Sequence, residues 1–371
     1  MNALDILAGN LRFWFPAGGG REPLFMYVAA GAIAVLGPIA LALRLLAAMA
    51  ATLLVAASFA LGRRMFDGPT ALVAATLMAT NYWQVHTGRM GLRSALLPPL
   101  AALGFALLFR GLDRNRARYG VLGGVLLGLT AYTYFAARLL PLVAVAVARR
   151  RMGLVWLITY AATAAPMGLY VLLSPDRANE RVGEASVFAQ ADPTAALRDS
   201  VLGALGMFFL RGDQMWKYDF DAQPIFRPPI AALFLVGLAL CLLAFWRRGP
   251  WAALAWLVVM TLPTALATES PHFIRNGGLG PVLFLFPALA AVWLWRRLPP
   301  PVGRLAPVAL VLLLAGTGAA TYREYFVEWA GSGGSTSPRR PSNQWSRPGG
   351  STGDARNCTT SCRGSYGSTD T

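Results

Sequence analysis

Residues 45–62 read LLAAMAATLLVAASFALG, an apolar run of 18 residues without a charged side chain, and Arg63 and Arg64 follow it directly. A helix needs about 20 apolar residues to cross the hydrocarbon core of a bilayer, and somewhat fewer suffice where the bilayer is thinned. A single strand in lipid would leave its backbone polar groups unsatisfied, so the run predicts a helix. We therefore expect a membrane span that ends at a basic loop.

Runs of this kind recur along the whole chain of 371 residues, of which 56% are hydrophobic and 13% charged. Soluble chains carry about 25% charged residues. A water-soluble domain of this size could not bury so much apolar surface, which excludes a soluble enzyme. The sequence predicts an all-α, polytopic integral membrane helix bundle with interfacial helices on its outer face. About ten spans are expected, at 45–62, 69–85, 92–109, 119–135, 139–148, 152–173, 229–246, 250–267, 277–295 and 304–322.

The basic residues indicate how the bundle is oriented. The chain has 33 basic and 17 acidic residues, a net charge of +16. Five short loops, 63–68, 110–118, 149–151, 247–249 and 296–304, together hold 14 arginines and two acids, Asp67 and Asp113. Such loops face the cytoplasm in membrane proteins. Because the arginines lie in short clusters between apolar runs, we expect no nucleic-acid partner. The remaining carboxylates are therefore expected on the outer face.

Three segments are expected along the chain. Residues 1–44 form an outer-face interfacial segment, and residues 45–330 form the membrane bundle with a long outer loop at 174–228. Residues 331–371 contain no Val, Ile, Leu, Met or Phe, so this low-complexity tail is expected to be disordered. The apolar run 24–43 has two interpretations: it spans the membrane itself, or it lies flat on the outer surface as an interfacial helix.

The first candidate site residues lie near two basic motifs. Glu22 stands in GREPL (20–24), where the chain enters the membrane; it is either a catalytic carboxylate or part of an interfacial ion pair. In HTGRMGLR (86–93), a continuous helix would place Arg89 and Arg93 on one face. Two arginines so placed would repel each other unless an anion lay between them, and a phosphate fits the guanidinium geometry. The alternative is contact with lipid headgroups.

Two further motifs predict anion binding. Arg138 follows Tyr132 and Tyr134 at the start of a short span, where the tyrosines also suit an aromatic belt. In TESPHFIRN (268–276), Ser270-Pro271 resembles a helix N-cap and first turn, which would offer N–H groups to an anion. His272 and Arg275 would share the first turns of that helix. The alternative is an ordinary capped helix whose arginine contacts lipid.

Acidic residues accompany aromatic ones in RGDQMWKYDFD (211–221). Asp213 and Asp219 are candidates for contacts with sugar hydroxyls, and a solvated acidic loop is the alternative. No motif requires a cofactor. A divalent metal ion held by Glu22, Asp213 or Asp219 stays open, whereas two histidines exclude a histidine-rich metal site.

Four strings resemble one family in matching order: GREPLFMYVAAGAIAVLGPIALALRLLAA, GRMGLRSALLPPL, GLTAYTYFAARLLPL and ESPHFIRNGGLGP. They are similar to bacterial phospholipid carrier-dependent glycosyltransferases, which include protein mannosyltransferases and aminoarabinose transferases of the C-type membrane fold. The resemblance covers about residues 3–330. It implies transfer of a sugar from a polyprenyl-phosphate carrier, within the membrane, to an acceptor on the outer face.

In that family an acidic residue in the first outer loop, usually in an Asp-Glu pair after a first span, serves as catalytic base or activates the acceptor. The chain begins after that point, and Asp5 is followed by Ile6, so we do not assign the role to Asp5. The resemblance therefore predicts a fragment without this base, and it favours the flat arrangement of the first apolar run.

The combined analysis predicts a membrane glycosyltransferase in the bacterial plasma membrane with its active face outward. Its partners would be a polyprenyl-phosphate-linked sugar, membrane lipid and an unidentified acceptor. Attack on a sugar phosphate needs a base for the acceptor and cations for the leaving phosphate. The alternatives are a lipid or sugar transporter or flippase, and a truncated, inactive transferase that only binds lipid. The candidate catalytic residues are Glu22, Asp213 and Asp219, and the candidate phosphate-binding residues are Arg89, Arg93, Arg138, His272 and Arg275.

Overall fold

The structure, a computed structural model, describes residues 2–15, 21–147, 150–175, 186–215, 218–219 and 222–329. Within these ranges the chain is helical and forms no strand beyond two isolated bridges, Phe15 with Arg21 and Ser186 with Ala267. The predicted all-α class is confirmed. The described residues belong to one compact unit, Met1–Ser335. The tail 331–371, for which we predicted disorder, lies outside the described residues.

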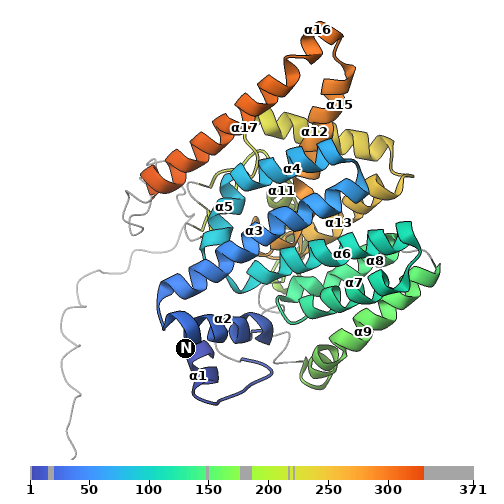
Figure 1. Cartoon of the computed structure of the whole chain (residues 1–371). Helices are drawn as coiled ribbons and strands as arrows, with labels where there is room; N and C mark the ends of the chain where they lie inside the picture. The colour runs from blue at the N-terminus through green and yellow to red at the C-terminus, as the bar shows by residue number, and fades with distance from the viewer. Residues whose placement is uncertain are drawn as a thin grey trace, which may run out of the picture. The chain divides into compact units, whose positions relative to one another are not determined.

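The helices follow one another in the order drawn in Figure 1. The first half of the chain holds α1 (Asn2–Leu7), α2 (Pro23–Leu36), α3 (Ala40–Met65), α4 (Gly68–Thr80), α5 (Tyr82–Arg89), η1 (Arg93–Leu96), α6 (Leu97–Arg114), α7 (Ala117–Thr130), η2 (Phe135–Leu139), α8 (Leu140–Val147) and α9 (Arg150–Leu173). The second half holds η3 (Val187–Ala189), α11 (Pro193–Gly206), α12 (Pro228–Leu243), α13 (Arg248–Ala265), η4 (Gly277–Leu279), α14 (Gly280–Leu283), α15 (Leu285–Arg297), α16 (Pro300–Gly303), α17 (Ala306–Tyr322) and the π-helical η5 (Arg323–Trp329).

Five helical stretches of the described chain are long and apolar enough to cross a membrane. They are Ala40–Met65, Arg93–Arg114, Met152–Leu173, Gly277–Arg297 and Pro300–Glu328. In the third and fifth of these stretches few side chains are buried, 17% and 6%, as expected for helices that face lipid. Several apolar helices are shorter, such as Gly68–Thr80 and Pro228–Leu243. The membrane class is therefore supported, and the number of about ten spans stays a prediction.

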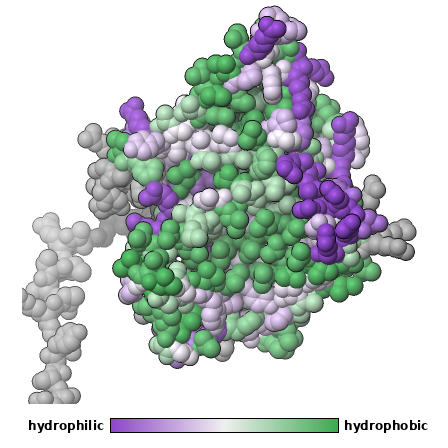
Figure 2. Space-filling view, in the orientation of Figure 1, coloured by the Kyte–Doolittle hydropathy of each residue, from purple (hydrophilic) through white to green (hydrophobic). Residues whose placement is uncertain are grey.

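The basic loops lie at one end of the helices, which we call the basic end. Asp113 pairs with Arg64 at 3.2 Å and with Arg248 at 2.8 Å, and Asp67 pairs with Arg296 at 2.7 Å. These contacts join four of the five loops that the sequence assigns to the cytoplasmic side. Figure 2 shows apolar side chains over much of the visible face, with hydrophilic ones gathered along its right-hand side.

The other set of loops meets at the opposite end. Hydrogen bonds join segments that are far apart in sequence there: Leu24 N to Tyr132 O at 3.0 Å, Asn81 Nδ2 to Ile225 O at 2.9 Å, and Ser200 Oγ to Ala267 O at 2.7 Å. Much of the predicted outer loop 174–228 is not irregular, because α11 occupies Pro193–Gly206. These hydrogen bonds join loops that the arginine pattern assigns to the same side.

The apolar run 24–43 is divided into two helices. α2 ends at Leu36, Gly37 adopts a φ of 83°, and α3 begins at Ala40 after Pro38. A positive φ is readily adopted only by glycine, and proline cannot continue the helix. α2 has 14 residues, fewer than the roughly 20 of a full span. The run is therefore not one continuous span, while the interfacial placement of 1–44 stays a prediction.

The centre of the bundle is packed through small residues. Gly124 of α7 lies against α9 so closely that an added Cβ would be 2.7 Å from the backbone oxygen of Trp156. Close approach through glycine is a common means of joining helices in membranes. Large rings fill the adjoining core, for example Phe105 and Trp256 with centroids 4.4 Å apart. This packing holds the ends of the helices, and therefore the loops between them, in fixed positions.

Candidate functional site

Glu22 immediately precedes α2 and is 3% exposed. Its Oε2 lies 3.6 Å from Nη1 of Arg93, and its carboxylate also interacts electrostatically with Arg138. Three of the predicted residues therefore form one charged cluster, which we call the Glu22 cluster. A buried carboxylate needs such compensation, because leaving it uncompensated would cost several kcal/mol.

Arg93 and Arg138 both occupy short 3-10 helices that precede longer ones. Arg93 begins η1, and its guanidinium lies 5.2 Å from the ring centre of Tyr134. Arg138 lies in η2, four residues after that tyrosine, and interacts electrostatically with Tyr160 of α9. Tyr134, one of the two tyrosines that suit an aromatic belt, therefore packs against the Arg93 guanidinium.

The stretch from Tyr82 to Arg93 is not one continuous helix. α5 ends at Arg89, and Gly91 takes a φ of 63° before η1 begins. The condition under which Arg89 and Arg93 would share a helical face is therefore not met, because the chain turns between them. The guanidinium of Arg89 instead covers the rings of Tyr325 at 5.4 Å and Phe326 at 4.8 Å.

The ring of Tyr325 completes an aromatic group that the sequence did not predict. His86 is fully buried, stacks on Tyr82 with centroids 5.6 Å apart, and meets the edge of Tyr325 at 5.7 Å. Tyr325 lies in η5, beyond the last apolar run, where the only available signal was two adjacent aromatic residues. The contact shows that Arg89 joins α5 to the segment after α17.

The segment 268–276 does not form the predicted helix start. The first helical turn begins at Gly277, and Ser270 is not an N-cap. Its Oγ donates to the carbonyl of Ser200 at 2.7 Å instead. The predicted anion site at a helix N-terminus is therefore wrong, because contacts with α11 hold this segment in an irregular conformation.

His272 and Arg275 lie at the end of the molecule opposite the basic end. Nδ1 of His272 lies 3.4 Å from Oδ2 of Asp213, and its ring lies 5.1 Å from that of Tyr218. Arg275 pairs with Glu269 at 3.4 Å. The side chain of Glu269 is 57% exposed and that of Arg275 only 12%. Arg275 is therefore a largely buried cation whose carboxylate partner lies in solvent.

Asp213 is 2% exposed and accepts two backbone hydrogen bonds, from Met215 N and Phe273 N, each at 2.9 Å. It is not the solvated loop residue of the alternative interpretation. Asp219 is also buried, at 1% exposure. The rest of the predicted acidic and aromatic motif, residues 216–217 and 220–221, lies outside the described residues.

Residues next to the two cationic motifs line one crevice, whereas Arg93, His272 and Arg275 themselves lie outside its lining. Leu92 and Ser94, on either side of Arg93, line it together with Phe273 and Ile274, which follow His272. Trp83 reaches across, with its ring centroid 6.0 Å from that of Phe273. The polar side chains in its wall are Gln84, Thr87 and Ser94. The structure thus brings the second and fourth predicted motifs to the same place.

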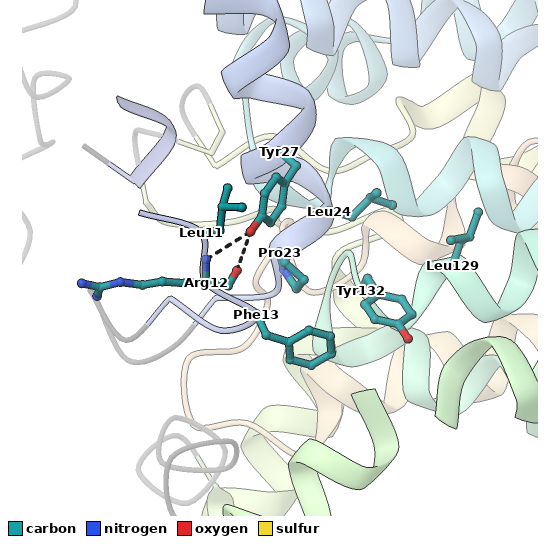
Figure 3. A pocket seen from close by; sticks show the side chains of 8 residues that line it. All are labelled: Leu11, Arg12, Phe13, Pro23, Leu24, Tyr27, Leu129 and Tyr132. Carbon is teal, nitrogen blue, oxygen red and sulfur yellow. Dashed lines mark hydrogen bonds between the residues drawn. The ribbon is translucent and has the colours of Figure 1, made fainter. Parts of the chain in front are cut away.

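A second, more open pocket of about 410 Å³ begins beside the Glu22 cluster. Figure 3 shows the rings of Phe13, Tyr27 and Tyr132 around it and the side chain of Arg12 directed away. The Tyr27 hydroxyl donates to the Arg12 carbonyl at 3.0 Å and accepts from the Arg12 N–H at 3.1 Å. The pocket is almost wholly apolar, and it is lined by Leu11, Arg12, Phe13, Pro23, Leu24, Tyr27, Leu129 and Tyr132.

No group of three or more His, Cys, Asp or Glu side chains that could hold a metal ion occurs in the described part of the chain. Glu22, Asp213 and Asp219 are not assembled as one ligand set there. Glu22 lies beside cations, and both oxygens of Asp213 accept backbone N–H groups. The described residues therefore give no support to a metal site built from these three carboxylates.

Comparisons with known proteins give a family domain and a fold. Residues 20–174 match the family model of dolichyl-phosphate-mannose-protein mannosyltransferase. No curated protein matches the chain by sequence. ArnT from Cupriavidus metallidurans, solved bound to undecaprenyl phosphate, is similar with a TM-score of 0.56 and 15% identity over 84% of this chain and 57% of that chain.

The archaeal oligosaccharyltransferase AglB from Archaeoglobus fulgidus, solved with an inhibitory peptide and a dolichol-phosphate, has a TM-score of 0.55 and 15% identity, over 86% of this chain and 50% of that chain. The chain thus spans about half the length of the solved relatives that it matches. Residues 20–174 match a mannosyltransferase family model, and the chain shares its fold with ArnT and AglB.

Proposed function

We propose that the protein transfers a sugar from a polyprenyl-phosphate carrier to an acceptor on the non-cytoplasmic face of the bacterial plasma membrane. The observation that carries the proposal is the meeting of two cationic segments, around Arg93 and around His272, at one crevice opposite the basic end. The family domain and the fold support the same reaction class.

The transfer requires stabilisation of a leaving phosphate. The acceptor hydroxyl attacks the anomeric carbon, the bond between that carbon and the phosphate oxygen breaks, and negative charge collects on the phosphate. Guanidinium groups stabilise such charge strongly because their N–H donors match phosphate oxygens. We assign this role to Arg93, Arg138, Arg275 and His272. Arg89 covers aromatic rings, and we assign it to the attachment of η5.

Glu22 is our proposed proton acceptor among the described carboxylates. Its partner Arg93 is also a proposed phosphate ligand, so a bound phosphate would compete with the carboxylate for the guanidinium. Loss of an adjacent cation makes a carboxylate a better proton acceptor. Seating the donor would therefore also activate Glu22 toward the acceptor hydroxyl. Asp213 is less suited to this role, because both of its oxygens accept backbone N–H groups.

The apolar pocket beside Glu22 suits the hydrocarbon part of a lipid substrate. Its wall begins at Pro23, directly after the carboxylate, and carries three aromatic rings with almost no polar surface. A lipid chain placed there would gain from removal of apolar surface from water. We propose that this pocket holds part of a lipid, while the sugar and phosphate occupy the charged region.

The test of the proposed reaction is transfer of radiolabelled sugar from undecaprenyl-phosphate donors by the full chain in membranes. We expect Arg93→Gln and Arg275→Gln to lower the rate by about 100-fold each, the scale for loss of a charge-stabilising donor. The matched control is Arg198→Gln on α11, an arginine at the same end whose side chain is 74% exposed. Transfer by the two variants at the rate of the control would remove these arginines from the mechanism, and no transfer with any donor sugar would refute the function.

The orientation is tested separately by labelling single cysteines in a cysteine-free background. Gln190→Cys follows η3, at the end that we place outside, and Arg116→Cys lies in the basic loop between α6 and α7; both positions are exposed. A membrane-impermeant maleimide on intact cells should label position 190 and not position 116. The reverse pattern would place the crevice in the cytoplasm and refute the proposed face.

A further inference from the structure

We propose that Asp213 is a positioning residue that holds the His272 side chain at the crevice, rather than a group that contacts sugar or metal. The inference rests on the proposed function, because His272 is assigned there beside the donor phosphate. Asp213 comes from the loop after α11, and His272 comes from the loop after α13. The interaction therefore joins two loops that are separated by 59 positions in the sequence.

The geometry at Asp213 leaves its carboxylate little freedom. One oxygen, Oδ1, accepts the N–H of Met215, and the other, Oδ2, accepts the N–H of Phe273, each at 2.9 Å. The second oxygen is also 3.4 Å from Nδ1 of His272. The Asp213 carboxylate is thus oriented by Met215 of its own loop, binds the backbone N–H of Phe273, and faces Nδ1 of the His272 ring.

The contact has a chemical consequence for the imidazole. Nδ1 makes no hydrogen bond to the described residues, but it lies near enough to the carboxylate for a proton there to be favoured electrostatically, which would leave Nε2 as the nitrogen for other contacts. Tyr218 packs on the ring with centroids 5.1 Å apart, and Arg275 and Glu269 are the charged groups on the same segment. Asp213 lies within ion-pair distance of the ring, so its removal should affect the ring directly.

The backbone of His272 has other supports. Its carbonyl accepts from Thr264 Oγ1 at 3.2 Å and from Asn276 Nδ2 at 3.4 Å. These bonds do not depend on the Asp213 side chain. Replacement of the carboxylate by an amide of the same shape should therefore change the orientation and proton position of the ring more than the path of the loop.

The first experiment uses the fact that the chain has two histidines, His86 and His272. In the full protein labelled with ¹⁵N-histidine, the imidazole signals are recorded for the wild type, Asp213→Asn and Asp213→Glu. Asp199→Asn is the matched control, because it removes an exposed carboxylate from α11. We expect both changes at 213 to shift the His272 nitrogen signals and to leave those of His86 in place, and we expect the control to shift neither.

His272 signals that stay unchanged in folded Asp213→Asn and Asp213→Glu would overturn the proposal. This measurement needs no enzymatic activity, so it decides the role of Asp213 even if no donor sugar supports transfer. Asp213→Glu keeps the charge and moves it by one methylene, which provides a second variant if the amide does not fold.

The second experiment is a double-mutant cycle on transfer with Asp213→Asn and His272→Gln. If Asp213 acts through His272, each single change should lower kcat/KM by about tenfold or more, and the double variant should be no more than about threefold worse than His272→Gln alone. Multiplication of the two losses would show that Asp213 acts independently of His272 and would overturn the proposal.

Discussion

The ion pair between Glu22 and Arg93 should stabilise the fold measurably, and the perturbation is the cycle Glu22→Gln, Arg93→Gln and the double variant. At 3.6 Å the Coulomb attraction is about 4.6 kcal/mol at an effective dielectric constant of about 20. Desolvation of the two groups offsets part of this attraction. Because Glu22 is 3% and Arg93 19% exposed, we expect a net coupling free energy of about 2 kcal/mol.

The matched control is the ion pair between Arg198 and Asp199, which are adjacent in the sequence of α11. These groups are closer, at 3.1 Å, but their side chains are 74% and 67% exposed. If distance alone decided the coupling, the control pair would be the stronger one. If solvent exposure decides it, the coupling of the control is below about 1 kcal/mol, as for other surface pairs.

The assay is unfolding of the purified protein by SDS in mixed micelles, followed by tryptophan fluorescence. Each single change at the Glu22 cluster should lower the free energy of unfolding, and the double variant should lose less than the sum. Additivity of the two changes within about 0.5 kcal/mol would refute the argument. It would mean that the two side chains do not interact, and the proposed competition between Glu22 and phosphate for Arg93 would fail with it.

Three further outcomes are expected. Gly124→Ala should lower the free energy of unfolding by about 1–3 kcal/mol, the usual cost of overpacking, because the added Cβ would lie 2.7 Å from the backbone of α9. The control is Gly168→Ala, whose Cβ would meet nothing within 4 Å and which should be neutral or stabilising in the same assay. Equal losses of stability in the two variants would contradict the packing. Burial raises the pKa of Asp67, but hydrogen bonds from Thr70 and Arg296 outweigh it and hold the pKa below its ordinary value, so its stabilisation is present above about pH 4 and is lost as the pH falls through the lowered pKa. Asp67→Asn keeps an oxygen that can cap α4 but removes the charge that pairs with Arg296, so it should cost most near pH 7, at about 0.5–1 kcal/mol, and a loss that is the same at pH 3 would contradict this origin. Arg89→Ala should lower stability by about 1 kcal/mol, through lost cation–π contacts, and should leave transfer nearly unchanged; a loss as large as that of Arg93→Gln would return Arg89 to the phosphate-binding group.

The sequence predicted the helices well where one local property decides them. Apolar runs such as 45–62 and 152–173 lie within α3 and α9, because length and hydropathy are sufficient to specify a helix in a membrane. The grouping of the basic loops at one end was also predictable. The points at which apolar runs break into separate helices were harder to predict. The run 69–85, for example, is divided at Asn81, whose side chain caps α5 and also donates to the carbonyl of Ile225.

The site was predicted by residue type but not by arrangement. Glu22, Arg93 and Arg138 were identified separately, and only the folded chain shows that they form one cluster. Ser270-Pro271 has the local signature of a helix start, yet Ser270 hydrogen-bonds to α11 instead. A tertiary contact of this kind overrides a local preference, and no pattern within nine residues could reveal it.

The aromatic group around Tyr325 could not be predicted for the same reason. His86 and Tyr325 are separated by most of the chain, and neither residue alone indicates the contact. His86 is buried among aromatic rings, apart from Arg93 of the same motif, which lies in the Glu22 cluster.

The salt bridges of Asp113 and Asp67 have a consequence for biogenesis. In the proposed orientation, the charges of Arg64, Arg248 and Arg296 oppose passage across the bilayer while the chain is being inserted. After folding, the same side chains are paired with the two aspartates. In that orientation each of these arginines would act first as a signal to the insertion machinery and later as a tie between helices. A substitution there would combine misinsertion with loosened assembly, and the two defects would have to be measured separately.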